Sequence, residues 1–335
     1  MREALLYDRL DGEAVSCRLC AHRCRIPEGK RGLCGVRENR AGTLYSLVYG
    51  QVIALNADPI EKKPLFHFLP GTRALSVATA GCNFTCRHCQ NADISQSPRE
   101  NGTIPGREIS PAELVRAARR EGCRTIAYTY TEPTIFFEYA LDTARRAAEE
   151  GIKNVFVTNG YMTGEALEMI APVLDAANVD LKSFRDEFYR EVCGAKLKPV
   201  LETIKKMPEL GIWIEVTTLL IPGYNDSEEE LGEIAGFLSG IDSGIPWHVS
   251  GFYPTYRLTD APPTPAAALR KAREIGEAAG LRYVYTGNLP GDDGENTYCH
   301  SCRKKIVERT GYRLGEVNIR DGTCAYCSTP AAGVW

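Results

Sequence analysis

The chain has 335 residues, a formal net charge of −3, and 44% hydrophobic against 25% charged residues. This composition is typical of an ordered globular protein with one barrel-sized core, and it excludes a disordered chain and a strongly basic binder of phosphate backbones. No apolar stretch approaches the ~20 residues that span a bilayer, and the first residues lack the pattern of a signal peptide. We therefore expect a cytoplasmic protein without a membrane segment.

Residues 1–72 are predicted to form a cysteine-rich extension before the main fold. Their four cysteines follow the order Cys-x2-Cys-x3-Cys-x9-Cys, and His22 is a spare ligand among them. In a long intracellular chain, clustered cysteines indicate metal binding rather than disulfides. The set suits either zinc or an auxiliary [4Fe-4S] cluster, and we favour the cluster, which could pass electrons inward. These cysteines are Cys17, Cys20, Cys24 and Cys34.

Residues 73–290 alternate short apolar runs with helical stretches, which indicates a parallel sheet built from right-handed crossovers. Six such units would form a partial (β/α)6 barrel of the α/β class. An open, doubly wound sheet gives the same pattern, so periodicity alone does not choose between the two. Ser110 and Thr264, each followed by proline, mark two helix starts. The predicted strands are 74–80, 125–130, 154–158, 178–182, 212–220 and 247–252, with a further one at 282–285.

Three cysteines, Cys82, Cys86 and Cys89, directly follow the first predicted strand. A structural zinc site is closed by four protein ligands, whereas a [4Fe-4S] cluster held by three thiolates leaves one iron free to bind another molecule. The count therefore predicts a reactive cluster. The alternatives are a partial zinc site and a fortuitous grouping of cysteines.

The segment 81–91, with its Cys-x3-Cys-x2-Cys order and His88 before the last cysteine, resembles the signature of the radical S-adenosylmethionine (SAM) superfamily. Residues 73–256 resemble the pyruvate formate-lyase activating enzyme group, and the whole chain is similar to the AmmeMemoRadiSam-system radical enzymes. The resemblance favours the partial barrel, with chemistry at the carboxyl ends of the strands. It also implies that the open iron binds SAM, and that an injected electron cleaves SAM to a 5′-deoxyadenosyl radical.

The same resemblance implies roles for five residues near these strand ends. Glu132, in a segment where the family's two glycines are replaced, would receive the SAM ammonium, although an acidic residue next to a helix start has a capping role too. Asn159 would contact the ribose, but Asn-Gly is also a common turn. Asp180 and Lys182 match the Asp-x-Lys of the activating enzymes, with an ion pair as the alternative. His88 would lie against the adenine.

Three further residues are candidates for lesser roles. His248 is a candidate acid or base, but we expect a buried histidine whose hydrogen bonds are satisfied. Cys123 precedes an apolar strand and is predicted to be a small buried hydrophobe. Cys193 could reach the mouth of the barrel as a hydrogen-atom donor, an assignment that we do not make. No catalytic residue is predicted beyond the cluster ligands.

Residues 291–335 are predicted to form a zinc-ribbon-like module. Two Cys-x2-Cys pairs lie at nearly the spacing of a zinc ribbon, and Ile306, Val307 and Val317 between them can fill a small core. Zinc is the first choice of metal and an auxiliary iron–sulfur cluster the second. Basic residues at both ends of the chain lack an aromatic platform, so nucleic acid is not an expected partner. The four cysteines are Cys299, Cys302, Cys324 and Cys327.

Together these features predict a radical SAM enzyme that abstracts hydrogen from an unidentified small molecule, peptide or protein. A one-electron donor such as a flavodoxin or ferredoxin would serve as its reductant. The first alternative is an activase that acts on a glycyl-radical partner protein. The second is a zinc-ribbon module that binds RNA or protein, in which the central cluster is redox-inert.

Overall fold

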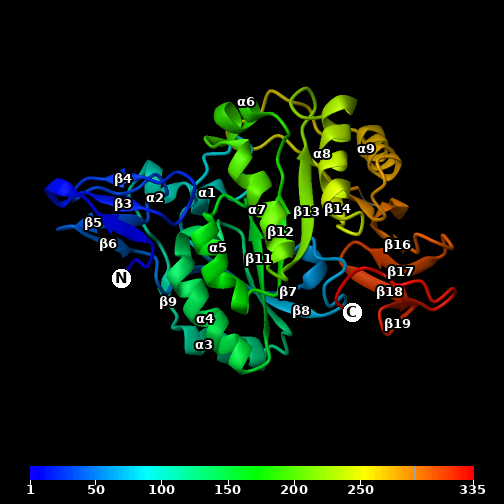
Figure 1. The fold of residues 1–335 in the computed structure, drawn as a ribbon, viewed down its shortest axis with the longest axis horizontal. Coiled ribbons are helices and arrows are strands. Elements are labelled where there is room, and N and C mark those ends of the chain that lie inside the picture. The colour runs from blue at the N-terminus through cyan, green and yellow to red at the C-terminus, as the bar shows by residue number, and fades with distance from the viewer. Residues whose placement is uncertain (290) are drawn as a thin grey trace.

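The computed structural model describes residues 1–289 and 291–335, so the last residue of the predicted barrel, 290, lies outside the described residues. A nine-stranded sheet forms the centre of the molecule (Figure 1). Seven of its strands are parallel and adjacent in chain order. They are β8 (Arg73–Thr79), β10 (Thr125–Tyr128), β11 (Lys153–Thr158), β12 (Ala176–Asp180), β13 (Trp213–Leu220), β14 (Trp247–Gly251) and β15 (Val284–Gly287).

The strand order decides between the two folds that periodicity left open. Since each parallel strand lies beside the next one in sequence, the order never reverses as it does in a doubly wound sheet. Right-handed crossovers in one direction place the connecting helices on a single face. The sheet ends at β15 on one side and at antiparallel β7 (Gln51–Pro59) and β9 (Arg107–Glu108) on the other. The predicted partial barrel is confirmed, with a seventh parallel strand.

Several strand ends differ from the prediction by one or two residues, and two of these shifts concern the fourth and the last strand. The fourth strand, β12, ends at Asp180, so Lys182 lies beyond it, where its backbone N–H donates to the Tyr189 hydroxyl at 3.0 Å. The last strand, β15, begins at Val284 rather than at 282. Both shifts leave the polar residues at the carboxyl edge of the sheet.

Six longer helices cover the sheet. Ser110 starts α3 with the predicted capping box, in which its hydroxyl accepts from the Glu113 N–H. The start predicted at Thr264 is wrong by one position: Pro265 is the N-cap, because the Thr264 hydroxyl accepts from the Phe252 N–H at 2.7 Å instead. The helices are α3 (Pro111–Arg120), α4 (Phe137–Glu149), α5 (Gly164–Ile170), α7 (Leu197–Glu209), α8 (Glu228–Ile241) and α9 (Ala266–Ala278), and the shorter ones are α1 (Ala92–Ser95), α2 (Ser97–Glu100) and α6 (Asp186–Phe188).

No helix within the described residues has both the length and the apolar character needed to cross a membrane.

The N-terminal residues form two small antiparallel sheets at one end of the molecule (Figure 1). A buried ion pair fastens them to α4: Arg37 Nη2 lies 2.8 Å from Glu138 Oε1, and both side chains are 2% exposed. The Leu5 N–H donates to the same carboxylate oxygen at 3.0 Å. The strands are β1 (Arg2–Glu3), β6 (Thr43–Ser46) and β5 (Arg37–Arg40) in one sheet, and β2 (Tyr7–Arg9), β3 (Val15–Cys17) and β4 (Arg25–Ile26) in the other.

The C-terminal residues form two separate small sheets, of three and two strands, at the opposite end (Figure 1). Ile306 and Val307 are buried as predicted, but Val317 is 47% exposed. That part of the prediction is wrong because Val317 lies on β18, an edge strand with no strand beyond it in the sheet. Arg309 fastens the module to the main fold by donating to the Phe66 carbonyl at 2.7 Å. The strands are β16 (Thr297–Tyr298), β17 (Lys305–Thr310), β18 (Arg313–Val317), β19 (Ile319–Arg320) and β20 (Thr323–Cys324).

Candidate metal centre and its cavity

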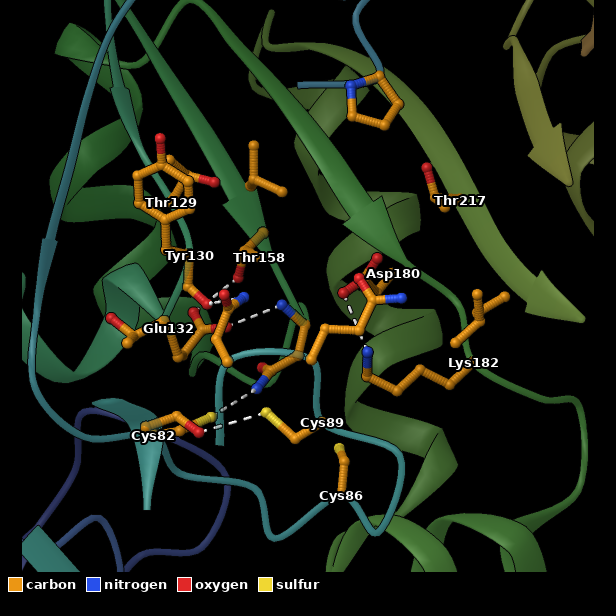
Figure 2. A pocket seen from close by; sticks show the side chains of 18 of the residues that line it. Cys82, Cys86, Cys89, Thr129, Tyr130, Glu132, Thr158, Asp180, Lys182 and Thr217 are labelled. Atoms are coloured by element: carbon orange, nitrogen blue, oxygen red, sulfur yellow. Dashed lines mark hydrogen bonds and ion pairs between the residues drawn. The ribbon is translucent and has the colours of Figure 1, made fainter. Parts of the chain in front are cut away.

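A cavity of about 440 Å³ lies at the carboxyl ends of the parallel strands. Its wall combines the three cysteines that follow β8 with polar residues from the loops after β10, β11 and β12 (Figure 2). The sequence analysis had selected eight of these residues, and the fold brings all eight to one cavity. They are Cys82, Cys86, Cys89, His88, Glu132, Asn159, Asp180 and Lys182.

The loop that carries the three cysteines, here called the central triad, turns at Gly81. This residue has φ of +104°, and a Cβ on it would lie 2.7 Å from Val36 Cγ1 and 3.2 Å from the Cys34 carbonyl oxygen. Only glycine fits, because the backbone is left-handed and a neighbouring segment packs directly against it. The sequence placed a glycine before the first cysteine, but the contact with residues 34 and 36 appears only in the folded chain.

The triad sulfurs are surrounded by donors that suit thiolate ligands. The Phe84 N–H donates to Cys82 Sγ at 3.4 Å, and Ser95 Oγ lies 3.2 Å from Cys89 Sγ. Burial raises the pKa of the Cys82 and Cys89 thiols. A bound cation would offset this burial and hold Cys82 and Cys89 as thiolates, and three soft thiolates select iron–sulfur clusters or zinc.

Cys193 does not line the cavity, because it is fully buried behind Cys86. A hydrogen bond from its thiol lowers the pKa of Cys86. Cys123 is buried at 5% exposure, as expected of a small hydrophobe. His248 is also buried, with Nε2 2.7 Å from Glu215 Oε2, so the expected satisfied histidine is present.

Glu132 is 2% exposed and is held by donors from three other residues. Its Oε1 accepts from Thr134 Oγ1 at 2.6 Å and from Thr158 Oγ1 at 2.7 Å, while its Oε2 accepts from the Asn159 N–H at 2.8 Å. It also caps the short helix at Pro133–Phe136. Burial raises the pKa of this carboxyl group despite these donors. Glu132 therefore performs the capping role and lines the cavity at the same time.

Asn159 sits between Glu132 and the triad loop. Its Nδ2 donates to Asn83 Oδ1 at 2.7 Å, and its Oδ1 accepts from the Tyr161 N–H at 3.0 Å. Gly160 has φ of +69°, and a Cβ on it would lie 2.9 Å from a Val179 methyl, so the turn requires glycine. The tight turn considered from the sequence is present, and it holds the amide at the cavity wall.

Asp180 and Lys182 form the ion pair considered from the sequence, with Nζ 2.9 Å from Oδ2 (Figure 2). Burial alone would lower the pKa of Lys182, but Asp180 and Cys86 outweigh it and raise that pKa well above its ordinary value. Lys182 therefore stays charged beside the triad. His88, 4% exposed, has the opposite behaviour, because burial lowers its pKa to about 3 and keeps it neutral.

Sequence reasoning missed part of the cavity wall. Lys62 and Lys63 line it from the segment before β8, and their Nζ atoms lie 3.0 and 2.8 Å from the two Asp58 carboxylate oxygens. Tyr130 donates its hydroxyl to the same carboxylate at 2.7 Å. Tyr312 contributes from the C-terminal module. No local pattern marks these residues, because only the fold brings them to the cavity.

Residues 76–236 match the family model of the radical SAM superfamily. The chain therefore contains a radical SAM domain. An uncharacterized protein of Methanocaldococcus jannaschii, MJ0808, is 48% identical over 330 residues, which cover 98% of each chain. The pyruvate formate-lyase 1-activating enzyme of Escherichia coli K12 is 21% identical over 235 residues, or 64% of this chain and 93% of that one. The structure of Streptococcus suis SuiB bound to S-adenosylmethionine has a TM-score of 0.51 at 16% identity, covering 69% of this chain and 53% of that one.

Beyond the radical SAM core, the C-terminal cysteine set (Cys299, Cys302, Cys324 and Cys327) is compact. Its four sulfurs all lie within 4.8 Å of one another, and the Cys299–Cys327 and Cys302–Cys324 sulfur pairs are 3.6 and 3.7 Å apart. Four sulfurs at the Zn–S distance of about 2.3 Å, arranged as a tetrahedron, are separated by about 3.8 Å. The set therefore has the dimensions of a mononuclear four-thiolate site.

The N-terminal cysteine set (Cys17, Cys20, Cys24 and Cys34) surrounds a small cavity of its own. Burial, and then the neighbouring Cys17, raises the pKa of Cys20. Burial also lowers the pKa of Arg37, but Glu138, Cys17 and Cys34 outweigh it. These effects show that the four thiols and the guanidinium are near neighbours. Among the described residues, however, the C-terminal set is the only group of three or more candidate ligands within 4.8 Å of one another.

Proposed function

We propose that this chain reductively cleaves SAM in the central cavity and uses the resulting radical to take a hydrogen atom from a substrate there. The observation that carries the proposal is the convergence of three cysteines, and no fourth, with Glu132, Asn159 and Lys182 on one cavity wall. Three thiolates from one loop fit a [4Fe-4S] cluster with an open iron. When bound, such a cluster supplies the electron that breaks the S–C5′ bond of SAM.

The residues of the chain would bind and orient SAM. The Glu132 carboxylate would accept hydrogen bonds from the SAM ammonium. Its oxygens already accept from Thr134 and Asn159, so they would be shared between these donors and SAM. Asn159 would face the ribose and His88 the adenine. Lys182, kept charged by Asp180, would face the SAM carboxylate or the substrate. Burial of these groups excludes water, which protects a reactive radical.

We further propose that the chain is of the AmmeMemoRadiSam type, with an unidentified small molecule, peptide or protein as substrate. A flavodoxin or ferredoxin would supply electrons. Zinc is proposed at the C-terminal cysteine set, because its sulfur spacing matches one tetrahedral ion. The domain limits that we propose stay those of the sequence analysis, at residues 1–72, 73–290 and 291–335.

A second candidate is an activase for a glycyl-radical enzyme. It is favoured by the similarity to a pyruvate formate-lyase-activating enzyme over 93% of that chain's length. Such an enzyme must admit a backbone glycine of a partner protein. A deuterium-transfer assay separates the two candidates, because the deuterium that reaches 5′-deoxyadenosine would come from a backbone glycine of a partner protein for the activase and from another substrate position otherwise.

The test of the proposed function is reductive cleavage of SAM by anaerobically reconstituted protein. Replacing Cys82, Cys86 or Cys89 individually by alanine should abolish 5′-deoxyadenosine formation, because each cysteine would ligate a different iron. Cys123→Ala is the matched control, since it removes a buried thiol outside all three cysteine sets. Retained cleavage in any single triad variant would refute the assignment.

A further inference from the structure

The N-terminal cysteine set differs from the compact C-terminal set in the spacing of its sulfurs. Its four cysteines line one cavity together with His22 and Arg37, yet within the described chain no three of its sulfurs lie within 4.8 Å of one another. Within the described chain, the three sulfurs of the central triad likewise do not all lie within 4.8 Å of one another. Thiolates that bind four separate irons must stand farther apart than thiolates that converge on one ion.

Arg37 gives a second and independent indication of an occupant. Its side chain is 2% exposed and lines the cavity, and its two terminal nitrogens donate to Glu138. Its Nε is buried and has no hydrogen-bond partner within the described residues. A buried N–H without a partner is destabilising, and more so when it belongs to a charged group. A sulfide or cysteine sulfur of a bound anionic cluster would satisfy it.

The N-terminal set is joined to the triad loop by direct contacts. His22 Nε2 lies 2.8 Å from the Asn83 carbonyl oxygen. Arg99 donates to the carbonyl oxygens of Leu33 at 2.8 Å and of Cys82 at 3.1 Å. Asn83 lines the N-terminal cavity while Cys82, its neighbour in the chain, lines the central one. Two consecutive residues of the triad loop therefore line the two cavities.

We propose that the N-terminal cysteine set holds a second [4Fe-4S] cluster, which relays electrons to the central triad; the relay role rests on the proposed function of the triad. One electron from a flavodoxin-type donor reduces this cluster from its 2+ to its 1+ state. The same electron then passes to the central cluster, and the N-terminal cluster returns to 2+. No bond is made or broken, and the hydrogen bonds of His22 and Arg99 to the triad loop provide a path for the electron.

Metal content tests the site without any assay of activity. A chain with all three triad cysteines replaced by alanine should retain about four irons and four sulfides. A chain with Cys20→Ser and Cys24→Ser should retain the central cluster alone, and Cys123→Ser should retain both. Zinc in place of iron in the triad-free chain, or no metal there, would overturn the inference and leave the proposed function intact. Iron that does not fall on removal of the triad would instead refute the proposed function.

The relay is tested first in the same triad-free chain, in which the N-terminal cysteines are unchanged. Flavodoxin hydroquinone should reduce its remaining cluster by one electron, as seen in the electron paramagnetic resonance spectrum. In the Cys20→Ser, Cys24→Ser chain, reduction of the central cluster should be at least tenfold slower with flavodoxin and unchanged with dithionite. Failure of flavodoxin to reduce the triad-free chain, or equal rates with both reductants, would refute the relay.

Discussion

The two outer cysteine sets have the same number of thiols but different surroundings. The C-terminal set is compact, sits on a small sheet, and leaves Cys327 exposed. The N-terminal set is open, encloses a cavity with a buried arginine, and touches the loop of the central triad. Ligand count alone therefore does not distinguish a structural ion from a redox cluster. We propose that sulfur spacing and contact with the triad loop do.

The two modules also meet the radical SAM core in different places. The N-terminal module packs behind the triad, where Gly81 contacts Cys34 and Val36. The C-terminal module is fastened through Arg309 to Phe66 and places Tyr312 on the cavity wall. We infer that the first position suits electron supply and the second suits the shaping of the substrate side. The following predictions test that contrast, from the largest expected effect to the smallest.

Removing the C-terminal ligands should unfold that module and spare SAM binding. Cys324→Ser combined with Cys327→Ser should release one zinc per chain, because zinc binding supplies roughly 10 kcal/mol or more to such small folds. Metal analysis, proteolysis of residues 291–335 and a SAM binding isotherm measure the three effects. Cys123→Ser is the control. If the lost metal is iron, the proposed contrast between the two outer sets fails.

Acid should loosen the attachment of the C-terminal segment through His67. This histidine is fully buried, with Nδ1 2.6 Å from the Ala332 carbonyl oxygen and Nε2 2.5 Å from the Tyr285 hydroxyl. Burial lowers its pKa to about 4, despite the opposing effect of Glu215 and assisted by Arg309 and His248. Between pH 6.5 and 4 the unfolded chain therefore binds a proton that the folded chain does not, so the free energy of unfolding falls as pH is lowered.

The loss attributable to His67 should reach roughly 3 kcal/mol across this window. Denaturant unfolding at several pH values measures it. His67→Gln keeps a neutral hydrogen-bonding side chain that does not titrate, so it should flatten the pH dependence. An identical slope in parent and variant would show that His67 does not carry the effect.

SAM affinity should depend on Glu132 and not on either outer module. Glu132→Gln removes the anionic partner of the SAM ammonium, and a charged hydrogen bond of roughly 1.5–3 kcal/mol corresponds to a Kd about ten- to hundredfold higher. The iron content should stay unchanged. Glu61→Gln is a matched control, because Glu61 is also buried but does not line the cavity. An unchanged isotherm for Glu132→Gln would leave this carboxylate with its capping role alone.

Gly81→Ala should weaken the contact between the N-terminal module and the triad loop. The new Cβ would clash with Val36 and strain a left-handed backbone, at a cost of about 1–3 kcal/mol. Gly122→Ala is the control, because Gly122 also has a positive φ, of +63°, but nothing lies within 4 Å of the added Cβ. Denaturant unfolding and proteolysis of residues 1–72 compare the two. Equal effects of the two substitutions would mean that the close contact at Gly81 does not stabilise the attachment of residues 1–72.

The sequence by itself determined the parallel α/β core and the residues at its strand ends. Apolar strand runs ending in polar loops are local patterns, and parallel strands bring such ends to one edge. The order of cysteines also identified the triad, because ligands for one cluster come from a single loop. Glu132, Asn159 and Lys182 were selected through the resemblance to the activating enzymes, and each lies in a segment that follows a strand.

Only the tertiary structure decided the strand order, the exposure of Val317 and the arrival of Lys62, Lys63 and Tyr312 at the cavity. It alone distinguished the spacing of the two outer cysteine sets and joined the N-terminal set to the triad loop through His22 and Arg99. The physical reason is common to all of these features. Each depends on contacts between segments far apart in the chain, which no local periodicity or ligand spacing encodes.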